Sequence, residues 1–317
     1  MINVDFIENL LELCYNLVNW FFWGVNQVGK FLKKNKIKLI VIVAVLVVFY
    51  IIASDQRLKT VEYTIETDKI ENPLSLALIT DLHSTYYGEN QQILVDAINK
   101  ENPDVVLFGG DIFDVNRPFD NSKIILKEIP KTYPCYFVTG NHEYKNENRE
   151  DTLDKILDIV SADGIKILDG TQDIIEINGE KVQISGIADP VSNYYDNDKP
   201  TYNEQLDLLE ENINDEYFSV LLTHRPELIE DYQKYSYDLA LAGHAHGGQW
   251  RIPFILNGVY APNQGIFPKY AGGLYEFENM DLIVSRGLSK NLLNIPRIFN
   301  RPELVIVNVV WYVCKNI

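Results

Sequence analysis

After residue 73, the pattern of apolar and polar positions alternates between short strands and amphipathic helices. Each of three short apolar runs is followed by apolar positions at helical spacing. The three runs are Leu74–Thr80, Val105–Phe108 and Cys135–Val138. A strand followed by a helix, repeated along the chain, predicts parallel strand pairing with right-handed crossovers.

The pattern becomes richer in strands beyond residue 170. Ile174–Ile177 and Val182–Ile184 flank Asn178-Gly179-Glu180, which predicts a β-hairpin. Further strands are expected at Ser219–Leu222, Asp238–Ala242, Leu282–Ser285 and Leu304–Val310, with a helix around Leu206–Ile213. We therefore expect an α/β fold in which two mixed sheets pack face to face under outer helices, as a four-layer α/β/β/α sandwich.

A different pattern occupies the N-terminal region. Residues 39–54 are uncharged and almost wholly apolar, and five lysines stand just before them, at positions 30, 33, 34, 36 and 38. Only Arg57 and Lys59 follow closely. The length of this apolar run is near the minimum for a helix that spans a bilayer. The lysine bias favours a transmembrane helix over a buried core helix, with the lysines in the cytoplasm and the chain after Asp55 outside.

A cleaved signal peptide is the less favoured interpretation of this region, because 38 residues precede the apolar run and no A-x-A site follows it. We interpret residues 39–54 as an uncleaved, single-pass signal-anchor in the cell membrane, with residues 30–38 as its basic cytoplasmic flank. Residues 1–29 are apolar at helical spacing and contain Trp20 and Trp23. They predict an amphipathic helix lying on membrane lipid, and a first, poor membrane span is the alternative. Residues 55–73 are interpreted as a linker and first strand, and residues 74–317 as the main domain.

Charge and cysteine content exclude some classes of function. The formal net charge is −17, which argues against nucleic acid as a partner, because phosphate backbones need a basic surface. The three cysteines are widely scattered and indicate neither a disulfide framework nor a cysteine-based zinc site.

All five histidines of the chain lie in short polar blocks at the ends of apolar runs. The blocks, together with one that supplies carboxylates, are Asp81-Leu82-His83, Gly110-Asp111, Gly140-Asn141-His142-Glu143, His224 and Gly243-His244-Ala245-His246. Each block alone could be an ordinary turn or helix cap. This explanation is weakest for the pair His244 and His246. Because functional groups gather where the strands of an α/β sheet end, we expect the blocks to converge on a single site.

The residue types in these blocks indicate a metal site. Imidazole, carboxylate and carboxamide ligands without thiolate suit manganese, iron or zinc. Seven candidate ligands are Asp81, His83, Asp111, Asn141, His224, His244 and His246. This number exceeds what one tetrahedral ion needs and suits two divalent ions that share a bridging carboxylate. Two such ions can hold a hydroxide between them and bind the oxygens of a phosphoryl group during in-line displacement.

In this order the blocks resemble the calcineurin-like metallophosphoesterase superfamily, whose pattern runs D-x-H, G-D, G-N-H-E/D, H and G-H-x-H. The resemblance covers about residues 74 to 310. It implies one metal held by Asp81, His83, Asp111 and His246, and a second held by Asp111, Asn141, His224 and His244, with Asp111 as the bridge. It also implies that His142 is not a ligand but faces the substrate.

Three further segments are similar to the membrane-associated bacterial branch of these phosphohydrolases: Gly247-Gly248-Gln249, Ser285-Arg286-Gly287 and Asn300-Arg301-Pro302-Glu303. Some members of that branch act on lipid or cell-envelope phosphoesters. The resemblance therefore makes a lipid-linked phosphoester one candidate substrate, beside other phosphodiesters and pyrophosphate-type substrates.

Our hypothesis from the sequence is a membrane-anchored phosphoesterase that uses a metal-bridging hydroxide, with His142 as general acid or electrostatic helper. Glu143 is expected either to orient His142 or to be an exposed loop carboxylate. Asp114 is expected beside the metals or on the surface, and Arg286 and Arg297 are either phosphate ligands or ordinary surface or salt-bridged arginines. The alternative function is a metal-binding, membrane-anchored module without hydrolytic activity.

Overall fold

The computed structural model describes residues 4–312 except 115, 146–148, 196–197 and 293–294, and it leaves out some side chains of the first helix. The chain divides into two compact units, Met1–Ala53 and Ser54–Ile317. The first unit is a single helix, α1 (Val4–Ala53). Among the described residues, one helical stretch is long and apolar enough to cross a membrane, Lys33–Ala53, and its 21 residues span about 30 Å.

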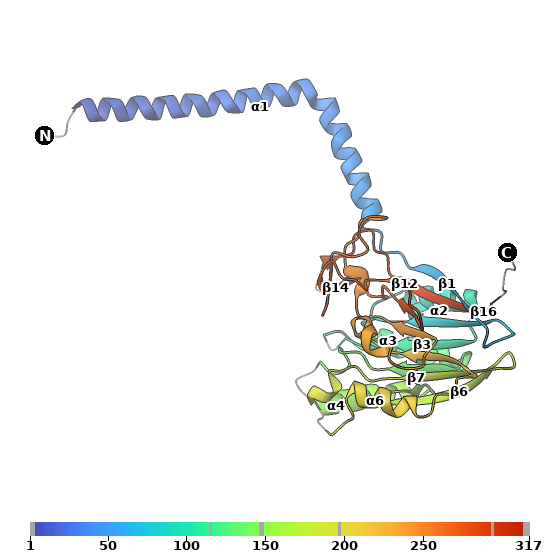
Figure 1. The fold of residues 1–317 in the computed structure, drawn as a ribbon. Helices are drawn as coiled ribbons and strands as arrows, with labels where there is room; N and C mark the ends of the chain where they lie inside the picture. The colour runs from blue at the N-terminus through green and yellow to red at the C-terminus, as the bar shows by residue number, and fades with distance from the viewer. Residues whose placement is uncertain (1–3, 115, 146–148, 196–197, 293–294, 313–317) are drawn as a thin grey trace. The chain divides into compact units, whose positions relative to one another are not determined.

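The second unit contains two six-stranded sheets packed face to face (Figure 1). The first sheet has the order β1 (Lys59–Thr67), β16 (Glu303–Trp311), β2 (Leu74–Ile79), β3 (Val105–Gly109), β4 (Cys135–Val138), β5 (Lys166–Ile167). The second has the order β12 (Gly273–Glu276), β13 (Asp281–Val284), β9 (Leu239–Ala242), β8 (Phe218–Leu222), β7 (Glu180–Gly186), β6 (Thr171–Ile177).

Short elements complete the second unit. Two small hairpins pair β10 (Tyr260–Ala261) with β11 (Gly265–Ile266), and β14 (Asn291–Leu292) with β15 (Ile295–Pro296). Single turns of 3₁₀ helix are η1 (Glu89–Gln91), η2 (Ile129–Lys131), η3 (Pro226–Leu228) and η4 (His246–Gly248).

Both sheets are mixed, as expected. In the first sheet β2, β3, β4 and β5 are parallel, while β16 runs antiparallel to β2 and parallel to β1. In the second sheet β7, β8, β9 and β13 are parallel, and antiparallel strands β6 and β12 form its edges. The predicted hairpin joins β6 to β7, where Asn178 and Gly179 have φ values of 54° and 88°, as a two-residue turn of this type requires.

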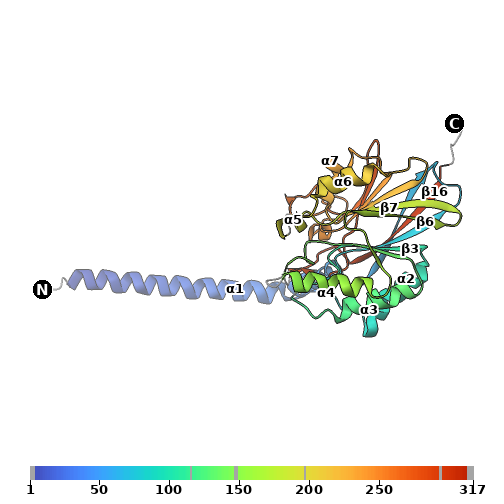
Figure 2. The same cartoon turned by 90° about the horizontal axis from the view of Figure 1, so that it is seen from below.

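Helices cover the outer faces of both sheets (Figure 2). On the first sheet lie α2 (Gln92–Glu101), α3 (Asp120–Glu128) and α4 (Arg149–Ser161). On the second lie α5 (Ser192–Tyr195), α6 (Tyr202–Glu210) and α7 (Ile229–Tyr232). The layers are therefore α/β/β/α, which confirms the fold predicted from the sequence.

The core between the sheets explains why the central strands are apolar at every position. Leu76 and Leu78 of β2 face the other sheet and pack in one cluster with Val220 and Leu222 of β8. The alternate residues of β2, such as Ala77, pack beneath the outer helices in a second cluster. A strand that is buried on both faces has no solvent-facing positions for polar residues. Its sequence is therefore a continuous apolar run.

Replacing Leu78 with alanine should destabilise the fold by about 2–5 kcal/mol, because it opens a cavity between the sheets. The matched control is Leu208→Ala on α6, where the leucine side chain is exposed and the change should stay within about 0.5 kcal/mol. Denaturant unfolding of the full chain in detergent measures both. Equal losses in the two variants would contradict the assignment of the inter-sheet core.

Candidate metal centre

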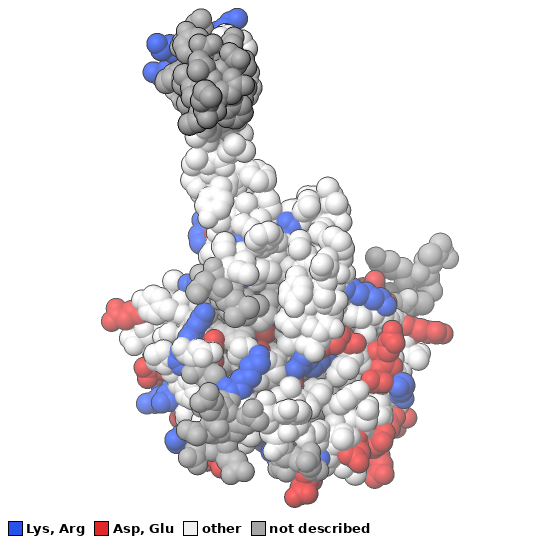
Figure 3. Space-filling model, turned by 90° about the vertical axis from the view of Figure 1, so that its left-hand side faces the viewer, with Lys and Arg blue, Asp and Glu red and all other residues white. Residues whose placement is uncertain are grey.

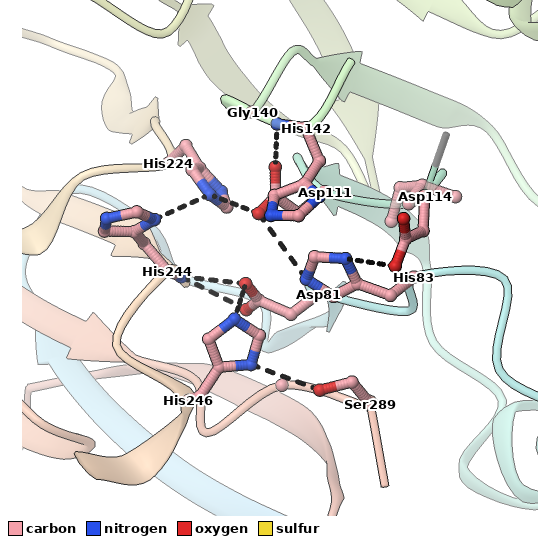
Figure 4. Close-up of polar contacts among 12 residues, drawn as sticks. Asp81, His83, Asp111, Asp114, Gly140, His142, His224, His244, His246 and Ser289 are labelled. Atoms are coloured by element: carbon pink, nitrogen blue, oxygen red, sulfur yellow. Dashed lines mark hydrogen bonds and ion pairs between the residues drawn. The ribbon is translucent and has the colours of Figure 1, made fainter. Parts of the chain in front are cut away.

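The ends of parallel strands from both sheets meet at one point, and six of the seven predicted ligands are seen there in Figure 4. Within the first sheet, Asp81 follows β2, Asp111 follows β3 and Asn141 follows β4. Within the second, His224 follows β8, and His244 and His246 follow β9. The polar blocks that are dispersed over more than 160 residues of sequence are thus brought to one edge of the paired sheets.

The backbone at this edge is held in an uncommon conformation. Five of the seven predicted ligands have positive φ values: Asp81 (50°), His83 (46°), Asp111 (54°), His244 (64°) and His246 (47°). Such values cost free energy in residues other than glycine and persist only where the surroundings impose them. Backbone hydrogen bonds do so here, because the Asp81 and His83 amides donate to the Gly110 and Asp111 carbonyls, each at 3.0 Å.

Glycines permit the close approach of these loops. A Cβ atom added to Gly110 would lie 2.7 Å from the Gly140 nitrogen, and one added to Gly243 would lie 2.5 Å from Asp81 Oδ2. Both distances are shorter than a van der Waals contact, so a side chain at either position would push the ligand loops apart.

Two overlapping groups of side chains form the centre. In the first group, Asp81, His83, Asp111 and His246 place one ligand atom each within 4.8 Å of one another. His83 Nε2 is 3.5 Å from Asp111 Oδ2, and His246 Nε2 is 3.5 Å from Asp81 Oδ1. These separations are too long for strong hydrogen bonds and suit atoms that share a cation between them.

The second group shares Asp111 with the first. It joins Asp111 to His224 and His244, again with ligand atoms within 4.8 Å. His224 Nε2 is 3.2 Å from Asp111 Oδ2 and 3.2 Å from His244 Nδ1. Asp111 is therefore the carboxylate common to both groups.

Each outer histidine has one nitrogen bonded to the protein and the other turned inward. His224 Nδ1 lies 2.8 Å from the Gly109 carbonyl and must donate to it, so Nε2 is the atom that faces Asp111. His244 Nε2 lies 3.0 Å from Asn263 Oδ1, so its Nδ1 is the inward atom. His246 Nδ1 lies 3.2 Å from Ser289 Oγ, so its Nε2 faces Asp81.

Several inward atoms are buried without a hydrogen-bond partner among the described residues. They are His83 Nε2, Asp111 Oδ2 and Asn141 Oδ1. Buried polar atoms of this kind cost free energy unless something compensates them. The imidazole and carboxylate groups converge on one point, and the Asn141 carboxamide directly follows Gly140, which packs against Asp111, so the residues present fit divalent metal ions.

The charges of the cluster are consistent with cation binding. Burial lowers the pKa of His83 to about 3 and lowers those of His244 and His246 well below the usual value, so these imidazoles keep their lone pairs. Burial also lowers the pKa of His224, but Asp111 and Asp81 outweigh it and raise that pKa to about 10. A proton on His224 Nε2 therefore occupies the place that a metal would take, and metal binding would displace it.

Glu143 is buried and supports the loops, which corrects both expectations for it. Its Oε2 accepts the amides of Asp111 and Gly140 at 3.0 and 2.8 Å, and its Oε1 accepts the amide of Phe113 at 3.1 Å. It is 1% exposed, and none of these bonds is to the His142 ring. Glu143 therefore fixes the turn that carries the shared Asp111.

His142 lies beside the two ligand groups. Its backbone amide donates to Asp111 Oδ1 at 2.7 Å, and its ring meets the ring of His83 edge-on at 4.4 Å between centroids. Its Nδ1 is buried without a partner among the described residues. Asp114 approaches from behind, with Oδ2 3.9 Å from His83 Nδ1, so it lies next to the centre rather than on the open surface.

A buried arginine network was not predicted. Arg225 donates from Nε and Nη2 to Asp189, and from Nη1 to Asn263 Oδ1 at 2.7 Å. The same Asn263 oxygen lies 3.0 Å from His244 Nε2, so the network fixes the orientation of a predicted ligand. The position of Arg225 next to His224 was the available signal, but nothing in the sequence pairs it with Asp189 or Asn263.

Arg286 and Arg297 are buried and bonded within the protein. Arg297 Nη1 donates to the Arg286 carbonyl at 2.7 Å, and its Nη2 lies 3.3 Å from Ser289 Oγ. Arg286 Nη2 donates to Asn257 Oδ1 at 3.0 Å. Arg286 Nε also lies 4.0 Å from Glu303 Oε2, which agrees with the expectation of a salt-bridged arginine, whereas Arg297 is bonded to backbone carbonyls and a serine. These contacts support the loop behind His246.

Comparisons with known proteins give independent evidence on the family of this chain. The model of the calcineurin-like phosphoesterase family matches residues 74–248, more than half of the chain. The chain is 30% identical to the uncharacterized metallophosphoesterase Cj0846 of Campylobacter jejuni, over 84% of this chain and 68% of that protein. It is 26% identical to the uncharacterized metallophosphoesterase YkuE of Bacillus subtilis, over 78% of this chain and 84% of that protein. It is 25% identical to the phosphodiesterase YaeI of Escherichia coli, over 75% of this chain and 83% of that protein.

Replacing Glu143 with alanine should destabilise the fold, because three buried amides lose their acceptor at about 1–3 kcal/mol each. Glu143→Gln keeps one acceptor oxygen and should lose less. Unfolding by denaturant, with metal chelated so that binding does not contribute, measures both variants. A Glu143→Ala variant as stable as the wild type would contradict the bracing role.

Proposed function

This chain belongs to the calcineurin-like phosphoesterase family and is a metal-dependent phosphoester hydrolase, and we propose that it hydrolyses a phosphodiester at a dinuclear metal centre. One observation carries the proposal: two groups of ligand atoms, each within 4.8 Å, share Asp111. Asp81, His83, Asp111 and His246 would hold one ion. Asp111, Asn141, His224 and His244 would hold the other.

Two divalent ions at this point, when bound, supply a water of lowered pKa and neutralise charge on the phosphoryl oxygens. The choice among manganese, zinc and iron stays open, because the ligand set suits all three. The protein contributes the fixed geometry. Asp111 is held by its own amide bonded to Glu143 and by Oδ1 accepting the His142 amide, so little reorganisation is needed on binding.

His142 is proposed as the group that protonates the leaving oxygen. It is the one histidine outside both ligand groups that include Asp111, and its Nδ1 has no partner among the described residues. Burial lowers the pKa of His142, which makes its protonated form a stronger acid when a substrate phosphate favours that form.

Positive side chains near the centre suit an anionic substrate. Figure 3 shows Lys and Arg side chains in the middle of one face, with Asp and Glu gathered toward its right-hand edge. An open pocket beside His83 is lined by two cations, Arg117 and Lys290, and by one carboxylate, Asp120. Arg117 Nη1 donates to the His83 carbonyl at 3.1 Å, which places this pocket next to the ligands.

A diester substrate is favoured by similarity to a protein named as a phosphodiesterase, YaeI. The metal ligands do not specify which group is esterified to the phosphate, since the same ions act on mono- and diesters. A lipid or cell-envelope phosphoester is the substrate class that membrane anchoring would favour.

We propose that Lys33–Ala53 anchors the chain in the cell membrane with the second unit on the outer side. The residues from Leu39 to Ile52 are exposed and apolar, a state that water disfavours and lipid does not. The preceding lysines orient the helix. A signal sequence is the competing interpretation. Residues 1–29 would contact membrane lipid on the cytoplasmic side.

A non-hydrolytic metal-binding module remains the alternative function. Such a module would need the same metal ligands, but it would not need His142 beside them. The two proposals differ in turnover, since both predict bound metal and only the first predicts hydrolysis.

The full chain in detergent should hydrolyse bis(p-nitrophenyl) phosphate with manganese, and excess chelator should abolish the activity. Asp111→Asn should lose both the metals and the turnover, because it removes the shared negative charge. The matched control, Asp96→Asn at an exposed position of α2, should keep two metals per chain and most of the activity. Metal content by mass spectrometry accompanies each rate.

His142→Ala serves in the same assay to separate chemistry from binding. It should keep the metals and lose about 10²–10⁴-fold in kcat, the contribution of a positioned general acid. Wild-type activity in Asp111→Asn would contradict the shared-site proposal. Two bound metals in the wild type without any turnover would favour the non-hydrolytic alternative.

A further inference from the structure

The second unit carries a surface of exposed apolar side chains on the loops that follow the metal ligands. We call it the apolar loop surface, and define it as Trp250, Ile252, Phe254, Ile255, Tyr260, Ile266, Phe267 and Ile295, all exposed. Residues 252–268 contain no Asp, Glu, Lys or Arg, although the whole chain has a net charge of −17. An exposed stretch of this composition needs an explanation.

Hydrogen bonds hold these side chains together in one structure. Tyr260 pairs with Ile266 in the β10–β11 hairpin, and the Phe267 amide donates to the Val259 carbonyl at 2.8 Å. The Trp250 ring nitrogen donates to the Pro296 carbonyl at 2.9 Å, next to Ile295. The segments that carry these apolar side chains are therefore bonded to one another.

The same loops are bonded to the segment that begins the second unit. The Arg251 amide donates to the Ile298 carbonyl at 3.0 Å. The neighbouring Arg297 carbonyl accepts Gln56 Nε2 at 3.1 Å. Gln56 is three residues after the end of Lys33–Ala53, a distance of at most about 11 Å of extended chain. The apolar loop surface is therefore bonded to the segment that starts the second unit, and only a short stretch of chain joins that segment to Lys33–Ala53.

The surface is also connected to the metal centre. Asn263, between β10 and β11, has its Oδ1 3.0 Å from His244 Nε2 and 2.7 Å from Arg225 Nη1. Asn263, which lies within the uncharged residues 252–268, therefore contacts the predicted ligand His244. A substrate that approached across the apolar loop surface would meet the centre directly.

We propose that the apolar loop surface inserts into the lipid bilayer beside the anchor and holds the metal centre at the level of the lipid headgroups. The inference rests on the proposed membrane anchor. Three features favour lipid over a protein partner: the absence of charged residues from 252 to 268, the exposure of Phe254 and Ile255 at the loop tip, and the short chain back to Lys33–Ala53. Large apolar side chains beside an anchor gain free energy by entering the interface.

Site-directed spin labelling of the full chain tests this placement. Cys14 and Cys314 are replaced with serine, and the buried Cys135 is kept. A nitroxide is attached at Ile255→Cys, and the chain is reconstituted into vesicles of phosphatidylethanolamine and phosphatidylglycerol. Collision with oxygen, which enters lipid, is compared with collision with a water-soluble nickel chelate. The label at position 255 should show a several-fold higher ratio of oxygen to nickel collisions than the control label.

The matched control is Ile174→Cys on β6, which is also an exposed isoleucine and should collide freely with the nickel chelate. Hydrolysis of bis(p-nitrophenyl) phosphate by each labelled chain confirms that the fold is intact. Equal nickel collision at positions 255 and 174 would overturn the proposal. A label at 255 that is immobilised and inaccessible to both reagents would indicate a second copy or another protein on this surface, and would also overturn it.

A third label, at Leu46→Cys within Lys33–Ala53, separates the two proposals. If position 46 is in lipid and position 255 is in water, the anchor stands and only the apolar loop contact fails. If position 46 is in water, the anchor itself fails and the loop contact fails with it.

Discussion

The shared carboxylate of Asp111 is the constraint on which the rest of the site depends. Its Oδ2 lies 3.5 Å from His83 Nε2 and 3.2 Å from His224 Nε2, so a single oxygen atom is common to the two groups of ligand atoms. Two groups that share a buried charge must be positioned together. The positive φ of Asp111, the Glu143 carboxylate beneath it and the close packing of Gly110 against Gly140 all serve that placement.

The sandwich provides this placement because two sheets end at the same edge. The first sheet contributes Asp81, Asp111 and Asn141, and the second contributes His224 and His244, so neither sheet has a complete pair of ion sites. The apolar clusters between and outside the sheets hold the two halves in register. Buried unpaired polar atoms are costly, and here that cost is concentrated where cations would compensate it.

Much of this could be predicted from the sequence, and the remainder could not for physical reasons. The spacing of apolar residues predicts the strands, the β6–β7 hairpin and the layers, because it reflects whether one face or both faces of an element are buried. It does not predict that β16 lies between β1 and β2, since that pairing joins segments more than 200 residues apart. The ligand types were visible at strand ends. The Arg225–Asp189 pair and the amides bonded to Glu143 were not, because they depend on loop conformation.

The most direct test of the account is anomalous X-ray diffraction from crystals of the full chain grown with manganese. The account predicts two anomalous peaks about 3.5–4 Å apart, one on either side of the Asp111 carboxylate. One should lie among Asp81, His83 and His246, and the other among Asn141, His224 and His244. A single peak, or two peaks that do not share Asp111, would contradict it.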